Sequence, residues 1–296
     1  MKINGVVIED TYAEAFPAWT SEVEITAATR YLAQEAGEHA TGFASSLIGC
    51  GVEAGIDRYL SPINSPDGRP GCVILMAHPD KQQLQKQALQ RLAECVLTAP
   101  TTAIFDGLPD APERIPVRLH FYGDGYEYKT QVGNRNVWAI PIMGGEFTIE
   151  EEIGAVQGVA GGNFFIMGTD QMSTLTAAMA AVEVIDGTDG AAASFPGGIT
   201  GSGSKVGSRK YKFMRATTND AFCPTIRQKN PNSMVPDGVK AIFEIVIDGV
   251  NLEVIERAMA DGIRAACRTP GVTHISAGNY GGTLGPYKLY LHELLS

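Results

Sequence analysis

Residues 66–100 read PDGRPGCVILMAHPDKQQLQKQALQRLAECVLTAP, and residues 236–270 read PDGVKAIFEIVIDGVNLEVIERAMADGIRAACRTP. The two segments align without a gap at an offset of 170, from the shared Pro-Asp-Gly at the start to the proline at the end. In each segment a turn leads into a short apolar run that has the length and composition of a strand. Asp80 and Asn251 then offer N-caps for the helices that follow. The chain therefore contains an internal repeat of a turn, a strand and a helix.

The two helices of the repeat are predicted from their periodicity, because every fourth residue is apolar or small. These residues are Leu84, Ala88, Leu92 and Val96 in the first copy and Val254, Ala258, Gly262 and Ala266 in the second. Upstream of each copy we predict a strand, a helix and a strand. They cover residues 23–28, 29–40 and 41–49 in the first half, and residues 163–168, 170–187 and 191–199 in the second. Each half thus follows the order β-α-β-β-α-β, the split βαβ plan of ferredoxin-like folds.

We therefore predict an α+β fold of two fused, duplicated ferredoxin-like (split βαβ) lobes with hairpin elaborations. Residues 1–146 are assigned to the N-terminal lobe with its hairpin insertion, and residues 147–296 to the C-terminal lobe. Within the insertion, the aromatic segments of residues 118–130, around a Gly-Asp-Gly turn, and residues 136–142 are predicted to be strands.

The composition excludes several classes of protein. The chain of 296 residues has a formal net charge of −10, whereas general nucleic-acid binders are usually basic. No apolar run reaches the roughly 20 residues of a membrane helix, and the N-terminus has no apolar leader. The five cysteines form no Cys-x-x-Cys pair, which predicts reduced thiols and a cytoplasmic location. The five dispersed histidines form no metal-binding motif, so no metal is expected.

The glycine-rich stretch GGITGSGSKVGSRKYKF, residues 197–213, invites comparison with nucleotide-binding loops. A Walker A loop needs a lysine directly after its last glycine, but here a serine precedes Lys205. Gly201, Gly203 and Gly207 are spaced one residue too widely for a dinucleotide fingerprint. The alternating segment SRKYKFMR that follows predicts a strand, whereas both motifs require a helix. The stretch is therefore not predicted to bind a nucleotide.

Anion binding is still possible in another form, because residues 201–230 contain seven cations and a single anion, Asp220. Such a concentration of one sign focuses the electrostatic potential toward an anionic ligand. The alternative is that cations along an exposed edge strand prevent edge-to-edge pairing. On the first interpretation, the candidate ligand-binding residues are Lys205, Arg209, Lys210 and Arg215.

Glu244 is the only charged residue within the apolar run AIFEIVI of the second copy. Such a carboxylate lies at the rim, is paired, or is desolvated with a raised pKa. The last environment suits general acid–base catalysis near neutral pH. At the offset of 170 its counterpart is Ile74, so the repeated fold does not itself require an acid there. Glu244 is the candidate catalytic residue.

Three polar residues are weaker candidates. Asn219, in TTNDAFCPT, is a candidate to bind a substrate. Asn279, in AGNYGG, is another candidate, and a tight turn explains it equally well. Asn163, among the glycines of AGGNFF, has the same two interpretations. Cys223 is disfavoured as a nucleophile because no neighbouring base is evident.

Nine segments, in order along nearly the whole chain, together resemble the formylmethanofuran–tetrahydromethanopterin formyltransferase family. They are ATGFASSLIGCGVEAGID, PDGRPG, LTAPTTAIFD, FYGDGY, GVAGGNFFIM, FPGGITGSGSKVGS, TTNDAFCPT, FEIVIDG and PGVTHISAGNYGGTLG. The resemblance implies transfer of a formyl group between methanofuran, an amine with an anionic tail, and N5 of tetrahydromethanopterin. It also implies two related α/β lobes, no metal or prosthetic group, and homo-oligomers with active sites near subunit contacts. The proposed catalytic glutamate of the family falls on Glu244.

The chain departs from the archaeal pattern of this family at QKNPNSM, residues 228–234, and is less acidic and richer in alanine and glutamine. It is similar to the bacterial form found in methylotrophs. That form resembles one subunit of a formyltransferase/hydrolase complex, in which a partner subunit hydrolyses formylmethanofuran to formate. The alternative function is a non-catalytic subunit that docks the anionic carrier for a partner hydrolase.

Overall fold

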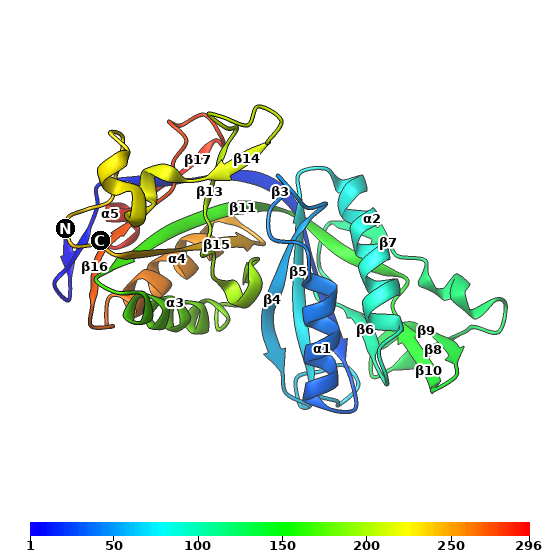
Figure 1. The fold of residues 1–296 in the computed structure, drawn as a ribbon. Coiled ribbons are helices and arrows are strands. Elements are labelled where there is room, and N and C mark those ends of the chain that lie inside the picture. Colours follow the sequence, from blue (N-terminus) through cyan, green and yellow to red (C-terminus); the bar gives the residue numbers. More distant parts are fainter.

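The computed structural model describes all residues, 1–296, and arranges them in two lobes that share a continuous β-sheet (Figure 1). In the N-terminal lobe the sheet order is β6-β3-β5-β4. Its elements are β3 (Tyr12–Thr26), α1 (Arg30–Thr41), β4 (Glu53–Leu60), β5 (Gly71–His78), α2 (Lys81–Arg91) and β6 (Ala103–Asp106). Leu84 and Ala88 of α2 are fully buried in the core of this lobe, as their periodicity predicts.

The C-terminal lobe repeats this plan, with the sheet order β16-β11-β15-β12. Its elements are β11 (Glu152–Gly168), α3 (Gln171–Ile185), β12 (Ala191–Ala193), β15 (Ala241–Gly249), α4 (Leu252–Ala266) and β16 (Val272–Ser276). Because both lobes have the strand order of the split βαβ plan, the predicted α+β fold of two duplicated ferredoxin-like lobes is confirmed.

A polar side chain caps the N-terminus of each of the four long helices. Thr29 Oγ1 accepts a hydrogen bond from the backbone N–H of Leu32, and Asp80, Asp170 and Asn251 cap α2, α3 and α4 in the same way. Each cap satisfies a backbone donor that has no partner inside the helix. The N-caps predicted at Asp80 and Asn251 are confirmed.

The long strands β3 and β11 connect the lobes, because Phe16–Thr20 pairs antiparallel with Val156–Ala160. The first residues of the chain, however, lie in the C-terminal lobe. There β1 (Lys2–Ile3) pairs with β2 (Val6–Ile8), β2 pairs with β16, and β17 (Tyr287–Tyr290) pairs with the start of β3 before the short helix α5 (Leu291–Leu294). The two termini consequently lie close together at one end of the molecule (Figure 1). The boundary between residues 146 and 147 stays a prediction.

The insertion extends the N-terminal sheet beyond β6, with β10 (Gly145–Ile149), β9 (Arg135–Ile142) and β8 (Tyr128–Val132) added in that order. A further strand, β7 (Glu113–Pro116), pairs with β11. The strand predicted at the start of residues 118–130 is wrong, because Leu119–Gly123 is a 3-10 helix. Its His120 stacks on Trp138 of β9, with ring centroids 4.4 Å apart, so this aromatic segment packs over the sheet instead of joining it.

Three further predicted strands are absent or shorter than expected. Thr41 is the last residue of α1, residues 42–49 form turns and bends, and the strand of that unit is β4, further along the chain. Within residues 191–199, β12 ends at Ala193 and a 3-10 helix begins at Pro196. Residues 208–215 form turns and bends at the tip of a hairpin made by β13 (Ser204–Val206) and β14 (Ala216–Thr218). Alternation of residue types shows that a segment is amphipathic, but a strand also needs a neighbouring strand to pair with.

The sequences of the two copies align at an offset of 170, but structurally equivalent positions in their strands are 171 residues apart. Ile74 of β5 packs in the core with the helices of its own lobe, and the residue in this position of β15 is Ile245. The prediction that Ile74 is the counterpart of Glu244 is therefore wrong by one residue. The counterpart is Val73, which alternation places on the sheet face away from the helices.

A π-helical segment explains why the C-terminal prolines of the two copies are nevertheless 170 residues apart. The N-caps Asp80 and Asn251 keep the offset of 171. The helix α2 then continues as the π-helical segment Leu92–Leu97, which has no counterpart after α4. Because hydrogen bonds in a π-helix span five residues, this segment accommodates one additional residue. The offset thus returns to 170 at Pro100 and Pro270.

Different parts of the chain cover the two faces of the C-terminal sheet. Phe164 and Ile166 of β11 pack against α3 and α4, whereas Phe165 and Met167 pack on the other face, with Val235 from the segment between β12 and β15. In Figure 1 the yellow part of this segment, next to β13 and β14, lies across the sheet from α3 and α4. The segment includes the glycine-rich stretch and the cation-rich residues 201–230, here called the basic window, and it covers the face on which Glu244 lies.

Candidate active site

Glu244 lies in the middle of β15, between two partners. Phe165 of β11 pairs with it on one side, and Thr200 forms an isolated antiparallel bridge with it on the other. The Thr200 N–H donates to the Glu244 carbonyl oxygen at 2.8 Å, and the Glu244 N–H donates to the Thr200 carbonyl oxygen at 3.0 Å. Directly paired residues of a sheet point to the same face. The side chains of Glu244, Phe165 and Thr200 are therefore neighbours.

The carboxyl group of Glu244 is partly buried and has no ion-pair or hydrogen-bond partner. Burial raises its pKa from 4.5 to about 7, because the charged form loses hydration and gains no compensating contact. The phenol of Tyr280 lies near enough for this carboxylate to contribute to its raised pKa, although burial is the larger cause. Of the three environments considered for Glu244, the structure thus shows the desolvated one.

A cavity of about 150 Å³ opens in front of Glu244. Its floor is formed by Phe165 of β11 and by Ile242 and Glu244 of β15. The other residues that line it come from the glycine-rich stretch, from Thr218–Asn219 and from the turns of the 3-10 helices that follow. A Cβ atom on Gly203 would lie 2.7 Å from Oε2 of Glu244. Because only glycine leaves room for the carboxyl group at this position, the glycine-rich stretch passes directly over Glu244.

The structure brings Asn219 into this cavity and leaves Asn279 outside it. Asn219 lies at the base of the β13–β14 hairpin, where its backbone N–H donates to the Gly203 carbonyl oxygen at 2.8 Å, and its side-chain amide has no partner. Asn279 is exposed and donates to Thr11 Oγ1 at 3.0 Å. Asn163 is buried and exchanges hydrogen bonds with the Gly278 backbone, so its role is structural.

The basic window consists of paired and unpaired cations. Lys205 and Arg209 both bind the carboxylate of Asp220, with Nη2 of Arg209 2.9 Å from Oδ2. Lys210 and Arg215 are exposed at the hairpin tip and have no carboxylate partner. Both lie outside the three-residue strands β13 and β14, so protection of an edge strand does not explain them. Of the four candidates, Lys210 and Arg215 are therefore the two whose charge no carboxylate neutralises.

Cys223 also lines the cavity, but its thiol lies 3.3 Å from Thr218 Oγ1 and 3.3 Å from the Asn219 carbonyl oxygen. No histidine is among the lining residues. A thiol nucleophile needs a base to remove its proton, so the geometry does not support covalent catalysis by Cys223.

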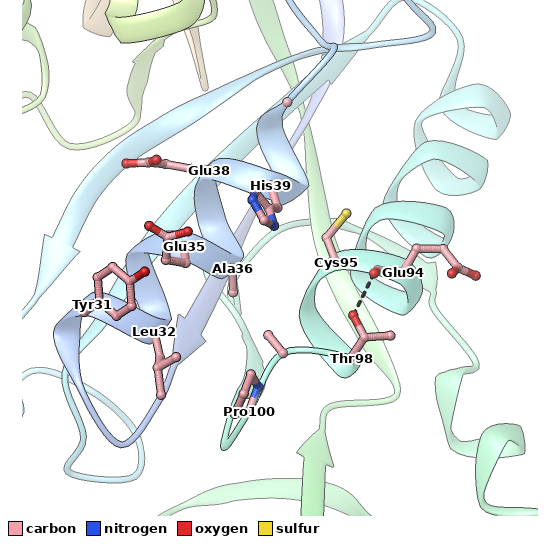
Figure 2. A pocket seen from close by; sticks show the side chains of 12 residues that line it. Tyr31, Leu32, Glu35, Ala36, Glu38, His39, Glu94, Cys95, Thr98 and Pro100 are labelled. Carbon is pink, nitrogen blue, oxygen red and sulfur yellow. Dashed lines mark hydrogen bonds between the residues drawn. The ribbon is translucent and has the colours of Figure 1, made fainter.

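Other cavities of the protein are larger, and two of them are relevant here. A cleft of about 700 Å³ between the lobes is lined by residues 41–45, by residues 54–56 and by residues 193–198. A groove of about 590 Å³ lies on the N-terminal lobe, between α1 and the π-helical segment (Figure 2). Glu35, Glu38 and Glu94 border this groove, and none of the residues that line the Glu244 cavity does. The groove is thus separate from the candidate active site.

No group of three or more His, Cys, Asp or Glu side chains is arranged to hold a metal ion. None of the helices has the length and apolar character needed to cross a membrane.

Comparison with known proteins identifies the family. A profile described as formylmethanofuran-tetrahydromethanopterin formyltransferase matches residues 1–142, and a profile for the proximal lobe of this enzyme matches residues 145–294. The chain belongs to this formyltransferase family. The family and the enzyme class predicted from the nine segments are confirmed.

Two curated relatives match essentially the whole chain. The formyltransferase of Methanosarcina acetivorans is 55% identical, and that of Methanothermobacter thermautotrophicus is 52% identical, each over 99% of this chain and 100% of the relative. Among solved structures, the formyltransferase of Methanosarcina barkeri superposes with a TM-score of 0.96 at 54% identity, over 99% of this chain and 100% of that one.

A second solved structure is described as the formyltransferase/hydrolase complex of Methylorubrum extorquens with methylofuran. One of its chains superposes with a TM-score of 0.93 at 40% identity, covering 100% of this chain and 99% of that one. Identity is thus higher to the archaeal relatives than to this bacterial protein. The predicted bacterial form stays a prediction, and these identities do not favour it.

Proposed function

We propose that this protein transfers a formyl group between methanofuran and N5 of tetrahydromethanopterin, with Glu244 as the proton shuttle. The observation that supports the role of Glu244 most directly is its unpaired carboxyl group, with a pKa of about 7, beside a small cavity. Such a group is half ionised near neutral pH, so it can both accept and donate a proton under working conditions.

The reaction needs one proton to move between two nitrogens. The attacking amine forms a bond to the formyl carbon, and the carbonyl electrons move onto the formyl oxygen. The Glu244 carboxylate takes the proton from the attacking nitrogen and gives it to the leaving nitrogen. The old C–N bond then breaks as the carbonyl re-forms, and no covalent enzyme intermediate is needed. Holding the two amines together supplies much of the rate enhancement.

The arrangement of cavities suits two carriers that meet at one reacting group. The Glu244 cavity, at about 150 Å³, has room for a formyl group but not for a pterin. The glycine-rich stretch borders both this cavity, through Thr200–Gly203, and the inter-lobe cleft, through Gly197 and Gly198. We place the anionic tail of methanofuran at the hairpin tip, beside Lys210 and Arg215.

The first prediction tests the shuttle. Glu244→Gln keeps the shape of the side chain but cannot exchange a proton, so kcat is expected to fall at least about 100-fold. In the unaltered protein, kcat/KM should fall as the pH is lowered through about 7, because the carboxylate must be free to accept the first proton. Stopped-flow or absorbance assays of formyl transfer measure both quantities.

Glu24→Gln is the matched control. Glu24, in β3 of the other lobe, is also a desolvated carboxyl with a pKa raised to about 7, and its strand partner is Val73, the structural counterpart of Glu244. This variant should keep its activity and its pH profile. Near-normal turnover by Glu244→Gln would exclude the shuttle.

The second candidate function is a non-catalytic subunit that docks the anionic carrier for a partner hydrolase. The unpaired cations at the hairpin tip favour docking, and the formyltransferase/hydrolase complex of Methylorubrum extorquens provides the precedent. Assay of the isolated chain separates the two functions, since formyl exchange without a partner excludes the purely docking role. The predicted homo-oligomer and hydrolase complex stay predictions.

A further inference from the structure

A single buried carboxylate holds the loop between β16 and β17, residues 277–286. Glu14 of β3 is only 1% exposed. Its Oε1 accepts hydrogen bonds from the backbone N–H groups of Tyr280 at 2.7 Å and Gly282 at 2.5 Å, and its Oε2 accepts one from Leu284 at 2.7 Å. A buried charge is costly unless it is well hydrogen-bonded, and here the loop backbone supplies the bonds. The shape of the loop and the charge of Glu14 therefore depend on one another.

The backbone of the loop is suited to this carboxylate. Gly281 and Gly282 have φ angles of +72° and +77°, in the left-handed region that favours glycine. Turns of this kind can direct successive N–H groups toward one anion. Burial by itself would raise the pKa of Glu14, but the N–H groups of the loop together lower it below 4.5. Glu14 is thus ionised at neutral pH, and it holds the loop in one shape.

The loop lies beside the Glu244 cavity. A Cβ atom on Gly278 would lie 3.3 Å from Cζ of Phe165, which lines the cavity and pairs with Glu244. In Figure 1 the red loop that precedes β17 is on the same side of the sheet as β13 and β14. Thr200 flanks Glu244 on the side opposite to Phe165. The glycine-rich stretch and the loop therefore border Glu244 from opposite sides.

Tyr280 is the aromatic side chain of this loop. It is 38% exposed, so a ligand can reach it. Its phenol lies close enough to Glu244 for the charge of that carboxylate to add to the effect of burial on its pKa. Residues 277–286 contain no charged side chain. This border of the site thus suits an uncharged aromatic ring, in contrast to the cationic hairpin tip on the other side.

We propose that Glu14 is a positioning residue and that Tyr280, which it holds in place, contacts the pterin ring system of tetrahydromethanopterin beside Glu244. This inference rests on the proposed formyl transfer and assigns the second carrier to one side of the site. The reacting N5 is part of the pterin, so this ring system must reach Glu244. A tyrosine on a fixed loop offers a large contact area to such a ring at a small cost in conformational entropy.

Glu14→Gln and Tyr280→Ala test the inference. A glutamine amide replaces one acceptor oxygen with a donor, so at least one N–H group of the loop loses its partner and the loop moves. Each variant should raise KM for tetrahydromethanopterin about tenfold, with kcat within about threefold of normal and KM for methanofuran unchanged. Tyr290→Ala removes a tyrosine of similar exposure, 40%, from β17 and should behave normally.

The double variant Glu14→Gln/Tyr280→Ala separates positioning from a general loss of stability. Because Glu14 acts through Tyr280, the double variant should raise KM no further than the single variants, about tenfold. A rise of about 100-fold, the product of the two single effects, would show that Glu14 acts independently and would overturn the inference. A normal KM for tetrahydromethanopterin in either single variant, or a raised KM for methanofuran, would overturn it as well.

Gly282→Ala tests the same loop while Glu14 is intact, in case Glu14→Gln does not fold. Alanine is strained at a φ of +77°, and its methyl group would meet only the flexible end of the Lys288 side chain, 2.9 Å from Nζ. The variant should therefore fold with a displaced loop and raise the same KM. A normal KM for tetrahydromethanopterin would contradict a role for the shape of the loop.

Calorimetric titration with tetrahydromethanopterin distinguishes this inference from the proposed function. If the chain catalyses no formyl exchange, the proposed function fails, but weaker binding by Glu14→Gln and Tyr280→Ala would still support the site. If formyl exchange is normal and both variants bind tetrahydromethanopterin as the unaltered protein does, only this inference fails.

Discussion

At the scale of single residues, the pKa of a buried carboxyl group depends on whether its neighbours supply hydrogen bonds or an ion pair. Glu244 has no cation within ion-pair distance, and burial therefore raises its pKa to about 7. By contrast, Glu14 accepts backbone N–H groups from Tyr280, Gly282 and Leu284, and these bonds lower its pKa despite desolvation. Two carboxylates of one lobe thus have pKa values shifted in opposite directions because their hydrogen bonding differs.

Gly203→Ala tests how closely the glycine-rich stretch must approach Glu244. The new methyl group would lie 2.7 Å from Oε2, so the carboxyl group must move. The end of a flexible side chain moves at little cost in stability, but a displacement of about 1 Å in an active site can cost about 100-fold in rate. We expect a melting temperature close to normal together with a large loss of kcat.

Gly201→Ala is the comparison for this variant. Its methyl group would meet the Phe243 ring at 3.6 Å, an ordinary contact, so it should lose much less activity than Gly203→Ala. Equal activities of the two variants would show that the carboxyl position is not critical.

At the scale of elements, the β13–β14 hairpin joins the two functional features. Its base, between Gly203 and Asn219, closes over the Glu244 cavity, and its tip carries Lys210 and Arg215. Asp220 neutralises the two cations nearest the base. The unpaired positive charge is thus held away from Glu244, whose pKa would otherwise fall.

The double variant Lys210→Gln/Arg215→Gln tests the anion-binding tip. It should raise KM for methanofuran severalfold at low ionic strength and weaken the dependence of KM on salt, with kcat unchanged. Lys86→Gln/Arg257→Gln removes two exposed cations elsewhere and serves as the control for net charge. An unaltered KM in the first variant would leave the cations without a role in carrier binding.

At the scale of the whole molecule, a pair of buried carboxyls joins the two lobes. Glu53 of β4 and Asp248 of β15 are almost fully buried, each charge influences the pKa of the other group, and Oε2 of Glu53 and Oδ2 of Asp248 have no hydrogen-bond partner. Oε1 of Glu53 accepts a hydrogen bond from the backbone N–H of Leu47, and Oδ1 of Asp248 accepts one from the backbone N–H of Gly161, each at 3.1 Å. Burial raises the pKa of Glu53 well above 4.5 and that of Asp248 to about 6. A proton on one of the two unpartnered oxygens could be donated in a hydrogen bond to the other, so we predict that the pair shares a proton.

Because both folded-state pKa values are raised, the stabilisation from this pair is complete below about pH 4 and is lost as the pH rises through about 6 and above. Glu53→Gln supplies a permanent N–H donor to Asp248, so its melting temperature should fall less than that of the unaltered protein between pH 5 and pH 8. Differential scanning fluorimetry across this range measures the change. Glu113→Gln, at an exposed acid, should keep the normal slope, and identical slopes in all three proteins would contradict the shared proton.

The sequence by itself determined the duplicated split βαβ plan, the N-caps at Asp80 and Asn251, and Glu244 as an isolated charge on one face of a strand. These features follow from local periodicity and capping, which act over one turn or a few residues. The tertiary structure alone decided that Thr200 and Gly203 lie against Glu244, some forty residues further along the chain, and that Asn279 does not. It also decided the offset of 171 within the strands, which one π-helical segment returns to 170 before Pro100 and Pro270. The reason is that cross-strand partners and loop paths depend on contacts between distant segments, which no local pattern specifies.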